Sequence, residues 1–530
     1  MEKRDSIIKG TALLTGAGLV VKLLGAAYRI PLSRLIGPEG IGLYQMAYPV
    51  YLIFLSLSTA GLPIAISKII AEYSAEGNQN GIRKIFRAAL ILLMILGLTG
   101  TATMIWAAPW FACKVVADPR AVYSMWALAP AIFLMSLMAA YRGYFQGQQM
   151  MAPSAVSQMI EQTVRVGVAL ILVAVFIKNG LEWGAAGAAF GASAGGAAGL
   201  VYLIYTYWRQ SQPQKGIRLG SVKSDSFLKI MRRLIQFALP ISLAVILMPL
   251  LQTIDSLIVP AKLQSIGYTV PQATSLLGIL GNSWAVMYLP MIVTTAISTN
   301  LVPAIAAGNI KGFLKRGFSS GPRVKIEAGL RMAVFYLIPV AIFLYLFSSS
   351  IYRIIYGTPQ VEILSWLAPA VIFLGLEQVS AGILQGLGKP KLPLVHFIAG
   401  AILKIAVTFF TTGLPGLNLA GAALGTVCGS GLTALLNITI IRRLIRIKLR
   451  FLPAAVLSGI LLFIAGWYGK CWLQLNYIVE FGIIGLGGSL LYIGSLWFTG
   501  GIVSQDLEMV KKYLAKRSVE HGYGNITPNR

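Results

Sequence analysis

The first apolar run of the chain, GTALLTGAGLVVKLLGAAYRIPLSRLI at residues 10–36, decides the fold class. A helix needs about 20 predominantly apolar residues to cross roughly 30 Å of hydrocarbon, and this run meets that length. Lys22 interrupts the run, and no small-residue cleavage site follows the short basic segment in front of it. We therefore expect a retained membrane span and not a removed signal peptide.

Apolar runs of similar length repeat to the end of the chain. Together with the first run they predict an all-α integral membrane protein with fourteen transmembrane helices. The other runs cover residues 43–70, 88–111, 123–147, 158–178, 184–208, 235–260, 276–306, 331–351, 363–386, 393–413, 418–441, 453–472 and 477–499.

The composition excludes several other classes of protein. Hydrophobic residues make up 57% of the 530 residues and charged residues only 12%, whereas soluble domains carry about 25% charged residues. This excludes a soluble enzyme and a disordered chain. The three cysteines, Cys113, Cys428 and Cys471, lie far apart, so we expect neither a disulfide framework nor a cysteine metal site. We also expect no cofactor.

The distribution of basic residues predicts the orientation in the membrane. If the N-terminus lies in the cytoplasm, 31 of the 44 Lys and Arg residues fall in inner segments and six in outer segments. This bias follows the positive-inside rule. We therefore expect a multi-pass membrane protein with both termini in the cytoplasm. The net charge of +27 then needs no nucleic-acid partner.

Short motifs recur at a fixed offset of 239 residues. Leu-Ala-Pro-Ala at 128–131 returns at 367–370, and Arg165 is matched by Lys404. A repeat of six spans places both copies in the same direction, and such repeats commonly hold substrate sites between them. We expect two six-helix lobes related by a parallel repeat, with helices 13 and 14 appended. The expected parts are a lobe at 1–208, a basic cytoplasmic linker at 209–234, a lobe at 235–441, helices 13 and 14 at 442–500, and a cytoplasmic tail at 501–530.

Two predicted helices carry glycines at four-residue spacing, which brings them onto one face of each helix. Small residues on one face allow membrane helices to approach closely, so we expect these glycines to serve packing. They are Gly187, Gly191, Gly195 and Gly199 in the first lobe, and Gly421, Gly425 and Gly429 in the second.

Charged residues inside the spans are the candidate functional residues. A Lys or Arg at the centre of a spanning helix costs roughly 2.5–3.5 kcal/mol, and Lys22 and Arg29 are spaced to share one helix face. We expect that face to line a hydrated, protein-walled cavity. Arg142 and Arg165 are further candidates. Arg142 is equally well explained as an interfacial anchor, and Arg165 as the partner of Glu161 four residues earlier on its helix.

Few acids accompany these cations inside the predicted spans. Asp255 and Glu377 are the buried acids, and with Lys404 they form a second candidate group in the second lobe. His396 is either a proton carrier or a core histidine with a hydrogen-bond partner. The cavity is therefore expected to be positive and to take an anionic ligand. Guanidinium groups suit phosphate oxygens, and a small soluble anion satisfies this argument as well as a lipid diphosphate.

Three segments resemble a known family. They are KGTALLTGAGLVVKLLGAAYRIPLSRLIGPEGIGLYQMAYP at 9–49, GLPIAISK at 61–68, and YRGYFQGQQMMAPSAVSQMIEQTVRV at 141–166. The chain resembles the polysaccharide-exporter branch of the multidrug/oligosaccharidyl-lipid/polysaccharide (MOP) superfamily. Within it the resemblance is to the stage V sporulation protein B type, which is related to the MurJ-type lipid II flippases.

The resemblance implies a flippase and not an enzyme, with no catalytic residues. It would move an undecaprenyl-diphosphate-linked sugar, either lipid II or another polysaccharide unit, from the inner to the outer leaflet by alternating access. Lys22 and Arg29 match the family's basic central cavity. Asp255 fits a sodium site that some relatives have, but Lys404 stands where an acid is expected. The identity of the coupling ion, Na⁺ or H⁺, therefore stays open. An Asp255–Lys404 pair is an alternative to the sodium site. The resemblance also implies a location in the bacterial plasma membrane. The expected partners are a lipid-linked anionic oligosaccharide and the bilayer, and we expect a monomer.

Two other functions remain as alternatives. A cation/drug antiporter of the same superfamily would need acids in its cavity, yet the first predicted helix has none between Asp5 and Glu39. A membrane glycosyltransferase or polymerase would need a group of acids or a metal site, and the sequence offers no such cluster.

Overall fold

The computed structural model describes residues 2–59, 61–210, 227–306, 320–357, 362–447, 449–473 and 476–501. Throughout these ranges the regular structure is helical and contains no strand. Twelve helical segments among the described residues are long and apolar enough to cross a membrane. The helical structure and these apolar segments confirm the prediction of an all-α integral membrane protein.

Two regions account for the difference between fourteen predicted spans and twelve observed segments. The segment Gly16–Ala75 is counted once, although α1 (Glu2–Thr59) is kinked at Gly37, where φ is 66°, between the first two predicted spans. The predicted span 235–260 corresponds to α7 (Phe227–Ser265), most of whose central side chains lie outside the described residues. The count of fourteen stays a prediction.

The predicted span 43–70 contains a break that the hydropathy pattern does not reveal. Helix α1 ends at Thr59, and α2 (Leu62–Ala75) begins after Gly61, whose φ is 75°. Glycine adopts this left-handed conformation without steric cost, and Pro63 fits the first turn of a new helix because it has no N–H to leave unpaired.

The chain divides into two compact units. Unit 1 comprises Met1–Leu289, Ile355–Gly357 and Ile405–Gly425, and unit 2 comprises Pro290–Ile354, Thr358–Lys404 and Thr426–Arg530. The predicted lobes at 1–208 and 235–441, and helices 13 and 14 at 442–500, stay predictions. Most of the predicted linker 209–234 and nearly all of the predicted tail 501–530 fall outside the described residues.

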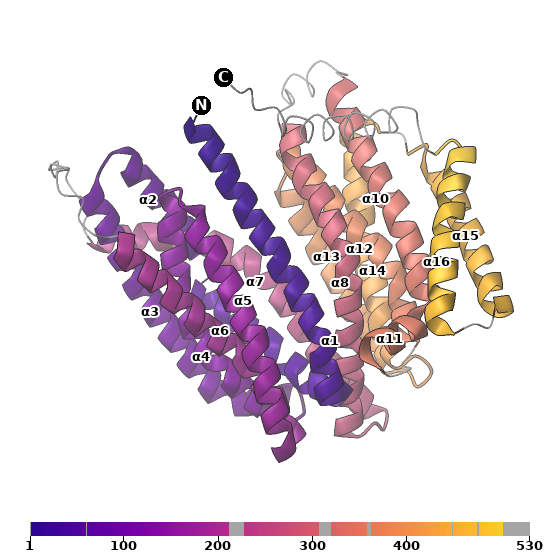
Figure 1. The fold of residues 1–530 in the computed structure, drawn as a ribbon, viewed down its shortest axis with the longest axis horizontal. Coiled ribbons are helices and arrows are strands. Elements are labelled where there is room, and N and C mark those ends of the chain that lie inside the picture. The colour runs from indigo at the N-terminus through magenta and orange to yellow at the C-terminus, as the bar shows by residue number, and fades with distance from the viewer. Residues whose placement is uncertain are drawn as a thin grey trace, which may run out of the picture. The chain divides into compact units, whose positions relative to one another are not determined.

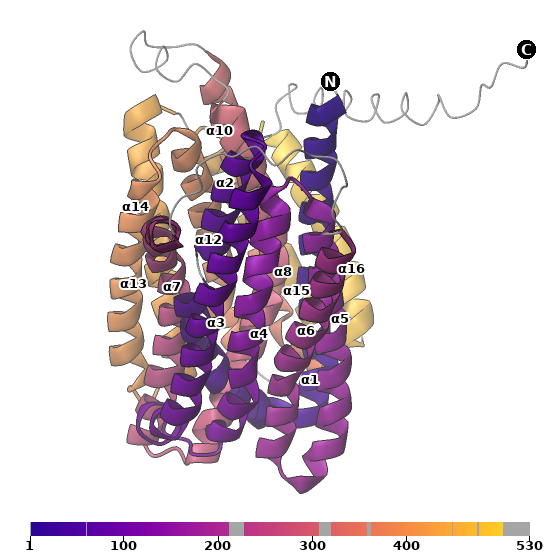
Figure 2. The same ribbon diagram turned by 90° about the vertical axis from the view of Figure 1, so that its left-hand side faces the viewer.

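Unit 1 contains α1, α2 and a bundle of long helices, visible in the indigo-to-magenta ribbon of Figures 1 and 2. In this bundle α4 packs against α3 and α6, and α5 packs against α6. A short π-helical turn, Phe111–Val115, ends α3, and α7 and the first part of α8 also belong to the unit. The bundle helices are α3 (Gln79–Trp110), α4 (Ala121–Gly147), α5 (Met151–Phe176), α6 (Leu181–Gln210) and α8 (Val270–Ala306).

The remaining helices belong wholly or partly to unit 2. Within it α12 packs against α10, and α15 packs against both α10 and α16. The short helix α11 was not among the predicted elements. These helices are α10 (Ser320–Leu346), α11 (Ser348–Tyr356), α12 (Ile363–Gly386), α13 (Lys391–Thr412), α14 (Leu419–Ile445), α15 (Leu452–Leu473) and α16 (Tyr477–Phe498).

The glycine ladder of α6 packs against α5, as predicted. A Cβ at Gly191 would lie 2.6 Å from the Arg165 carbonyl oxygen, and a Cβ at Gly199 would lie 3.2 Å from the Ser157 carbonyl oxygen. Gly195, between them, faces the Glu161 carbonyl and the Arg165 Cβ. Any side chain at these glycines would push the two helices apart.

A matching contact occurs inside unit 2. A Cβ at Gly429 of α14 would lie 2.7 Å from both the Gly400 carbonyl oxygen and the Lys404 Cβ of α13. Gly400 and Lys404 stand 239 residues after the two residues that Gly195 faces. The offset found in the sequence thus relates the α5 and α13 sides of these two contacts, each within its own unit, whereas Gly195 and Gly429 are 234 residues apart.

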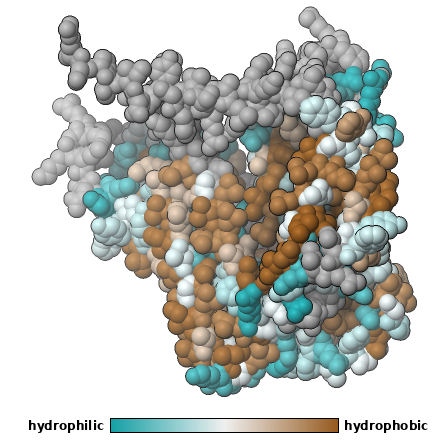
Figure 3. Space-filling view, turned by 45° about the vertical axis from the view of Figure 1, so that its right-hand side comes forward, coloured by the Kyte–Doolittle hydropathy of each residue, from teal (hydrophilic) through white to brown (hydrophobic). Residues whose placement is uncertain are grey.

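Large apolar side chains on the outer faces of the helices suit a lipid environment. On the face drawn in Figure 3, hydrophobic residues cover the helices, and hydrophilic residues gather mainly toward their ends. In α15 and α16, Trp472 is 86% exposed and Phe498 is 95% exposed. Such exposure is ordinary for a surface in contact with acyl chains, whereas a water-soluble surface rarely shows it over a wide area.

Candidate functional site

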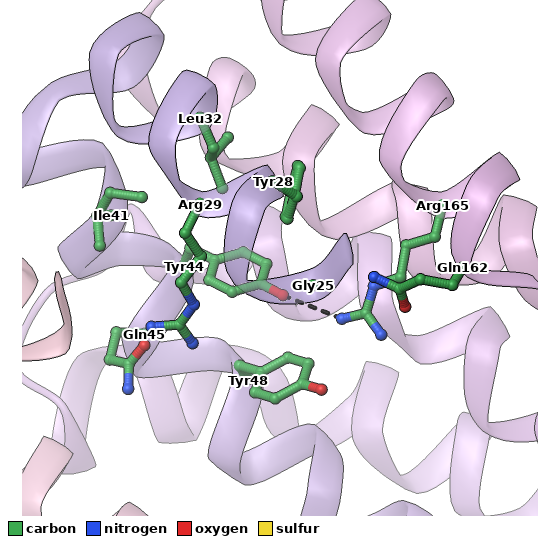
Figure 4. Close-up of a pocket in the computed structure, with 10 residues that line it drawn as sticks. All are labelled: Gly25, Tyr28, Arg29, Leu32, Ile41, Tyr44, Gln45, Tyr48, Gln162 and Arg165. Carbon is green, nitrogen blue, oxygen red and sulfur yellow. Dashed lines mark hydrogen bonds between the residues drawn. The ribbon is translucent and has the colours of Figure 1, made fainter. Parts of the chain in front are cut away.

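A cavity of about 170 Å³ lies in unit 1 between the two limbs of α1 and helix α5 (Figure 4). The limb before the Gly37 kink and the limb after it both contribute, so the kink shapes the cavity. The lining residues are Gly25, Tyr28, Arg29, Leu32, Ile41, Tyr44, Gln45 and Tyr48 from α1, and Gln162 and Arg165 from α5. None of these ten is acidic.

Arg29 enters the cavity from the first limb of α1. Its Nη1 donates a hydrogen bond to the carbonyl oxygen of Gly281 in α8, at 3.0 Å. In the part of the chain that the structure describes, Arg29 forms no ion pair. One neutral acceptor therefore orients this guanidinium and leaves its charge uncompensated.

Arg165 enters the same cavity from α5. Its Nη2 donates to the Tyr44 hydroxyl at 3.1 Å, and its guanidinium carbon lies 5.4 Å from the centre of the Tyr48 ring. The Tyr44 and Tyr48 rings are stacked, with centroids 5.4 Å apart, and Figure 4 shows the Tyr44 hydroxyl directed at Arg165. No carboxylate among the described residues pairs with Arg165.

The alternative that Arg165 pairs with Glu161 on its own helix is wrong. Glu161 Oε2 accepts a hydrogen bond from Arg142 Nη2 of α4 at 2.8 Å, and Arg142 Nε donates to the Ser157 hydroxyl at 3.0 Å. The ion pair forms between helices because α4 and α5 carry these groups toward each other. Arg142 does not line the cavity, and its direct contact with a substrate stays a prediction.

Two polar atoms of cavity residues are buried without a hydrogen-bond partner in the described part of the chain. They are the Tyr28 hydroxyl and the Gln45 side-chain oxygen. Buried polar groups normally have partners, because an unpaired one loses the free energy of its hydrogen bonds to water. The cavity therefore combines two uncompensated guanidinium groups with a hydroxyl that can donate to a polar ligand.

Lys22 lies two helical turns before Arg29, is exposed, and does not line the cavity. The structure thus brings Arg29 together with Arg165, from another helix, and not with Lys22, the predicted neighbour on the same face. A role for Lys22 elsewhere on the substrate path stays a prediction.

The second candidate group is divided between the units. Asp255 is partly buried in unit 1, whereas Glu377 and Lys404 belong to unit 2 and interact electrostatically there. An Asp255–Lys404 pair stays a prediction. The described residues contain no cluster of three or more His, Cys, Asp or Glu side chains able to hold a metal ion.

His396 has a hydrogen-bond partner, which favours the interpretation as a core histidine. Its Nδ1 lies 2.7 Å from the Asn437 side-chain oxygen, and the Asn437 amide donates to the Ser380 hydroxyl at 3.1 Å.

A polar cluster holds the region around the kink of α1. Arg120 bridges Glu39 of α1 at 2.6 Å and the fully buried Asp118 at 2.9 Å, and the Thr274 hydroxyl of α8 donates to Asp118 at 2.8 Å. Hydrogen bonds to Asp118 and Glu39 raise the pKa of Arg120, although burial opposes the rise. This cluster fixes the second limb of α1 that carries Tyr44 and Tyr48.

The tyrosines of the cavity and Gln162 were not among the predicted site residues. The available signal was the spacing of Tyr44 and Tyr48, which places two rings on one helix face, but aromatic residues at this spacing usually serve packing.

Comparisons with known proteins agree with this architecture. A family model described as polysaccharide biosynthesis protein matches residues 7–309. The chain is 29% identical over 483 residues to stage V sporulation protein B of Bacillus subtilis (strain 168), covering 90% of this chain and 91% of that protein. It is 27% identical over 494 residues to the lipid II flippase MurJ of the same organism, covering 87% and 89%.

Two solved structures share the fold. The lipid II flippase MurJ in an inward closed conformation gives a TM-score of 0.66 at 13% identity, covering 91% of this chain and 98% of that chain. An inward-facing multidrug resistance MATE family transporter of the MOP superfamily gives a TM-score of 0.64 at 18% identity, covering 80% and 94%. At such identities the likeness concerns the fold alone.

Proposed function

We infer that this chain, which belongs to the polysaccharide biosynthesis protein family, flips a lipid-linked sugar diphosphate across the membrane. It is a multi-pass membrane protein of the transporter type and not an enzyme. The proposed substrate is an undecaprenyl-diphosphate-linked sugar, either lipid II or another polysaccharide unit. The proposed direction is from the inner to the outer leaflet of the plasma membrane, with the protein acting as a monomer and both termini in the cytoplasm.

The observation that carries the proposal is the pair of guanidinium groups, Arg29 and Arg165, at one cavity, where the described residues supply neither an ion-pair partner nor an acidic lining side chain. Unpaired charges inside a protein are costly, and an anionic ligand would compensate these two. The guanidinium fork matches phosphate oxygens. An antiporter for cations would need an acid at this place, so the lining disfavours that alternative.

The cavity's size indicates which part of the substrate it holds. A cavity of about 150 Å³ accommodates a molecule of the size of benzene, so 170 Å³ suits a phosphate or a compact diphosphate and not a sugar chain. We therefore assign the cavity to the diphosphate that all such substrates share. The sugar and the prenyl chain would lie outside it.

Transport would follow alternating access, in which the predicted lobes rock and the diphosphate passes from an inward-open to an outward-open state. A membrane potential that is negative inside favours outward movement of an anion by about 2.3 kcal/mol per charge per 100 mV. Lys22 would attract the headgroup before it reaches Arg29. The coupling ion, Na⁺ or H⁺, and any role of Asp255, Glu377 and Lys404 in coupling stay open.

The test is translocation of a fluorescent undecaprenyl-diphosphate sugar in vesicles that contain the full chain. The double variant Arg29→Gln/Arg165→Gln should lose more than nine-tenths of the initial rate. The matched control Arg209→Gln changes an exposed arginine in the last turn of α6 and should keep the wild-type rate. Equal rates in the double variant and the wild type would remove the cavity from the transport path.

A further inference from the structure

We propose that Arg142 is a positioning residue that holds Glu161 away from Arg165 and so keeps the cavity positive. The inference rests on the proposed function, because it concerns the same anion site. Arg142 lines no part of the cavity, and its role would be carried entirely through Glu161.

The sequence of α5 places an acid one helical turn before the cavity cation. Glu161 precedes Arg165 by four residues, the spacing and order that favour an ion pair along a helix. In the structure, Glu161 and Arg165 have different partners. Glu161 pairs with Arg142 at 2.8 Å, and Arg165 contacts Tyr44 and Tyr48 instead.

Two further contacts hold the Arg142–Glu161 pair in place. Arg142 Nε donates to the Ser157 hydroxyl at 3.0 Å, and that hydroxyl donates to the Ser154 carbonyl oxygen at 2.8 Å. The two charged side chains are only 18% and 16% exposed. Water therefore screens the pair weakly, and neither partner exchanges easily for a water molecule.

Contacts with helix α6 fix the rotation of α5 about its axis near Glu161 and Arg165. Gly195 packs against the backbone of α5 at Glu161 and Arg165, and a Cβ at Gly199 would lie 3.4 Å from the Glu161 Cβ. Because α5 cannot turn, its acid faces α4 and its cation faces the cavity. The direction of each side chain then depends on the partner that is available on that side.

Loss of Arg142 would change the net charge at the cavity, although Arg142 does not line it. Glu161 would become a buried carboxylate without its cation, and the guanidinium of Arg165 lies one turn along the same helix. Pairing with Arg165 would neutralise one of the two cavity charges. Removing a cation from α4 should therefore weaken anion binding at α5, and removing the acid as well should restore it.

The second half of the chain offers no equivalent pair. At the repeat offset of 239, Ala381 corresponds to Arg142 and Gly400 to Glu161, while Lys404 corresponds to Arg165. The arrangement of acid, cation and distant partner is therefore specific to the unit that contains the cavity.

The experiment measures binding of farnesyl diphosphate, a soluble prenyl diphosphate, to the purified full chain by calorimetry. Arg142→Ala should weaken binding at least tenfold. Arg142→Ala/Glu161→Gln should return it to within about threefold of the wild type, and Glu161→Gln alone should bind at least as tightly as the wild type. Ser157→Ala removes one support of the ion pair and should show a smaller loss, again reversed by Glu161→Gln. If Arg142→Ala does not fold, Ser157→Ala with and without Glu161→Gln provides the test instead.

The outcomes separate this inference from the proposed function. If farnesyl diphosphate does not bind the wild type, or if Arg165→Gln leaves binding unchanged, the anion site itself is refuted and the role of Arg142 with it. If Arg165→Gln weakens binding but Arg142→Ala does not, only the positioning role is refuted. The positioning role also fails if Glu161→Gln does not restore binding in both the Arg142 and the Ser157 variants, because that result indicates a packing role.

Discussion

Replacing Arg165 with glutamine should weaken anion binding without lowering the stability of the protein. The substitution removes the guanidinium that Tyr44 and Tyr48 hold at the cavity. Hydrogen bonds to charged groups contribute about 1.5–3 kcal/mol each. A loss of about 2–3 kcal/mol in binding corresponds to a dissociation constant about 30- to 140-fold higher. Arg165→Lys keeps the charge but loses the planar fork, so we expect an intermediate loss.

The stability of the ligand-free protein gives the second measurement. Arg165 has no ion-pair partner in the described part of the chain, and a partly buried charge without a counter-charge destabilises the protein. Thermal unfolding in detergent without phosphate should therefore show an unchanged or higher Tm for Arg165→Gln. Farnesyl diphosphate should raise the Tm of the wild type and have little effect on the variant.

Either of two results would refute this reasoning. Unchanged affinity would mean that the anion does not contact Arg165. A clear fall in Tm without ligand, together with weaker binding, would mean that Arg165 serves packing and that its effect on binding is indirect. The control Arg209→Gln should change neither quantity.

Three further predictions follow from contacts near the cavity. Tyr44→Phe removes the hydroxyl that accepts from Arg165, and binding measured by calorimetry should weaken by about 0.5–1.5 kcal/mol, or twofold to about twelvefold; tighter binding would contradict the orienting role. A Cβ at Gly278 would meet the Pro38 carbonyl oxygen, so Gly278→Ala should cost about 1–3 kcal/mol and lower the Tm, whereas an unchanged Tm would show that α1 and α8 separate freely. The raised pKa of Arg120 means that its stabilising contribution is complete at any pH below the pKa of arginine in the unfolded chain and is lost only at higher pH. The difference in Tm between the wild type and Arg120→Gln should thus stay constant from pH 7 to pH 10, and a difference that shrinks in that range would argue against a lasting charge on Arg120.

The sequence predicted helices better than the breaks within them. Apolar length is a local property, so α3 to α6 could be located from hydropathy alone. The break at Gly61 was missed because a single glycine inside an apolar run does not interrupt its hydropathy. The kink at Gly37, by contrast, falls between two predicted spans.

Single candidate residues could be selected from the sequence, but their partners could not. Arg29 and Arg165 stand out because charges are rare in apolar runs, and each was a candidate for that reason. Their meeting depends on the packing of α1 against α5, which no local pattern encodes. The alternative that pairs Glu161 with Arg165 failed for the same reason: spacing along the helix favoured Arg165, while the structure supplies Arg142 from α4.

None of the described residues that line the cavity is acidic, and under the proposed function this would affect how the protein works in a cell. Two fixed positive charges would draw a neutralising ion from the surrounding solution, and a small phosphate compound would suit a cavity of about 170 Å³. Loading would then be an exchange, in which the incoming lipid displaces a resident counter-ion. The rate would respond to the phosphate supply of the cell by competition alone, without a separate regulatory site.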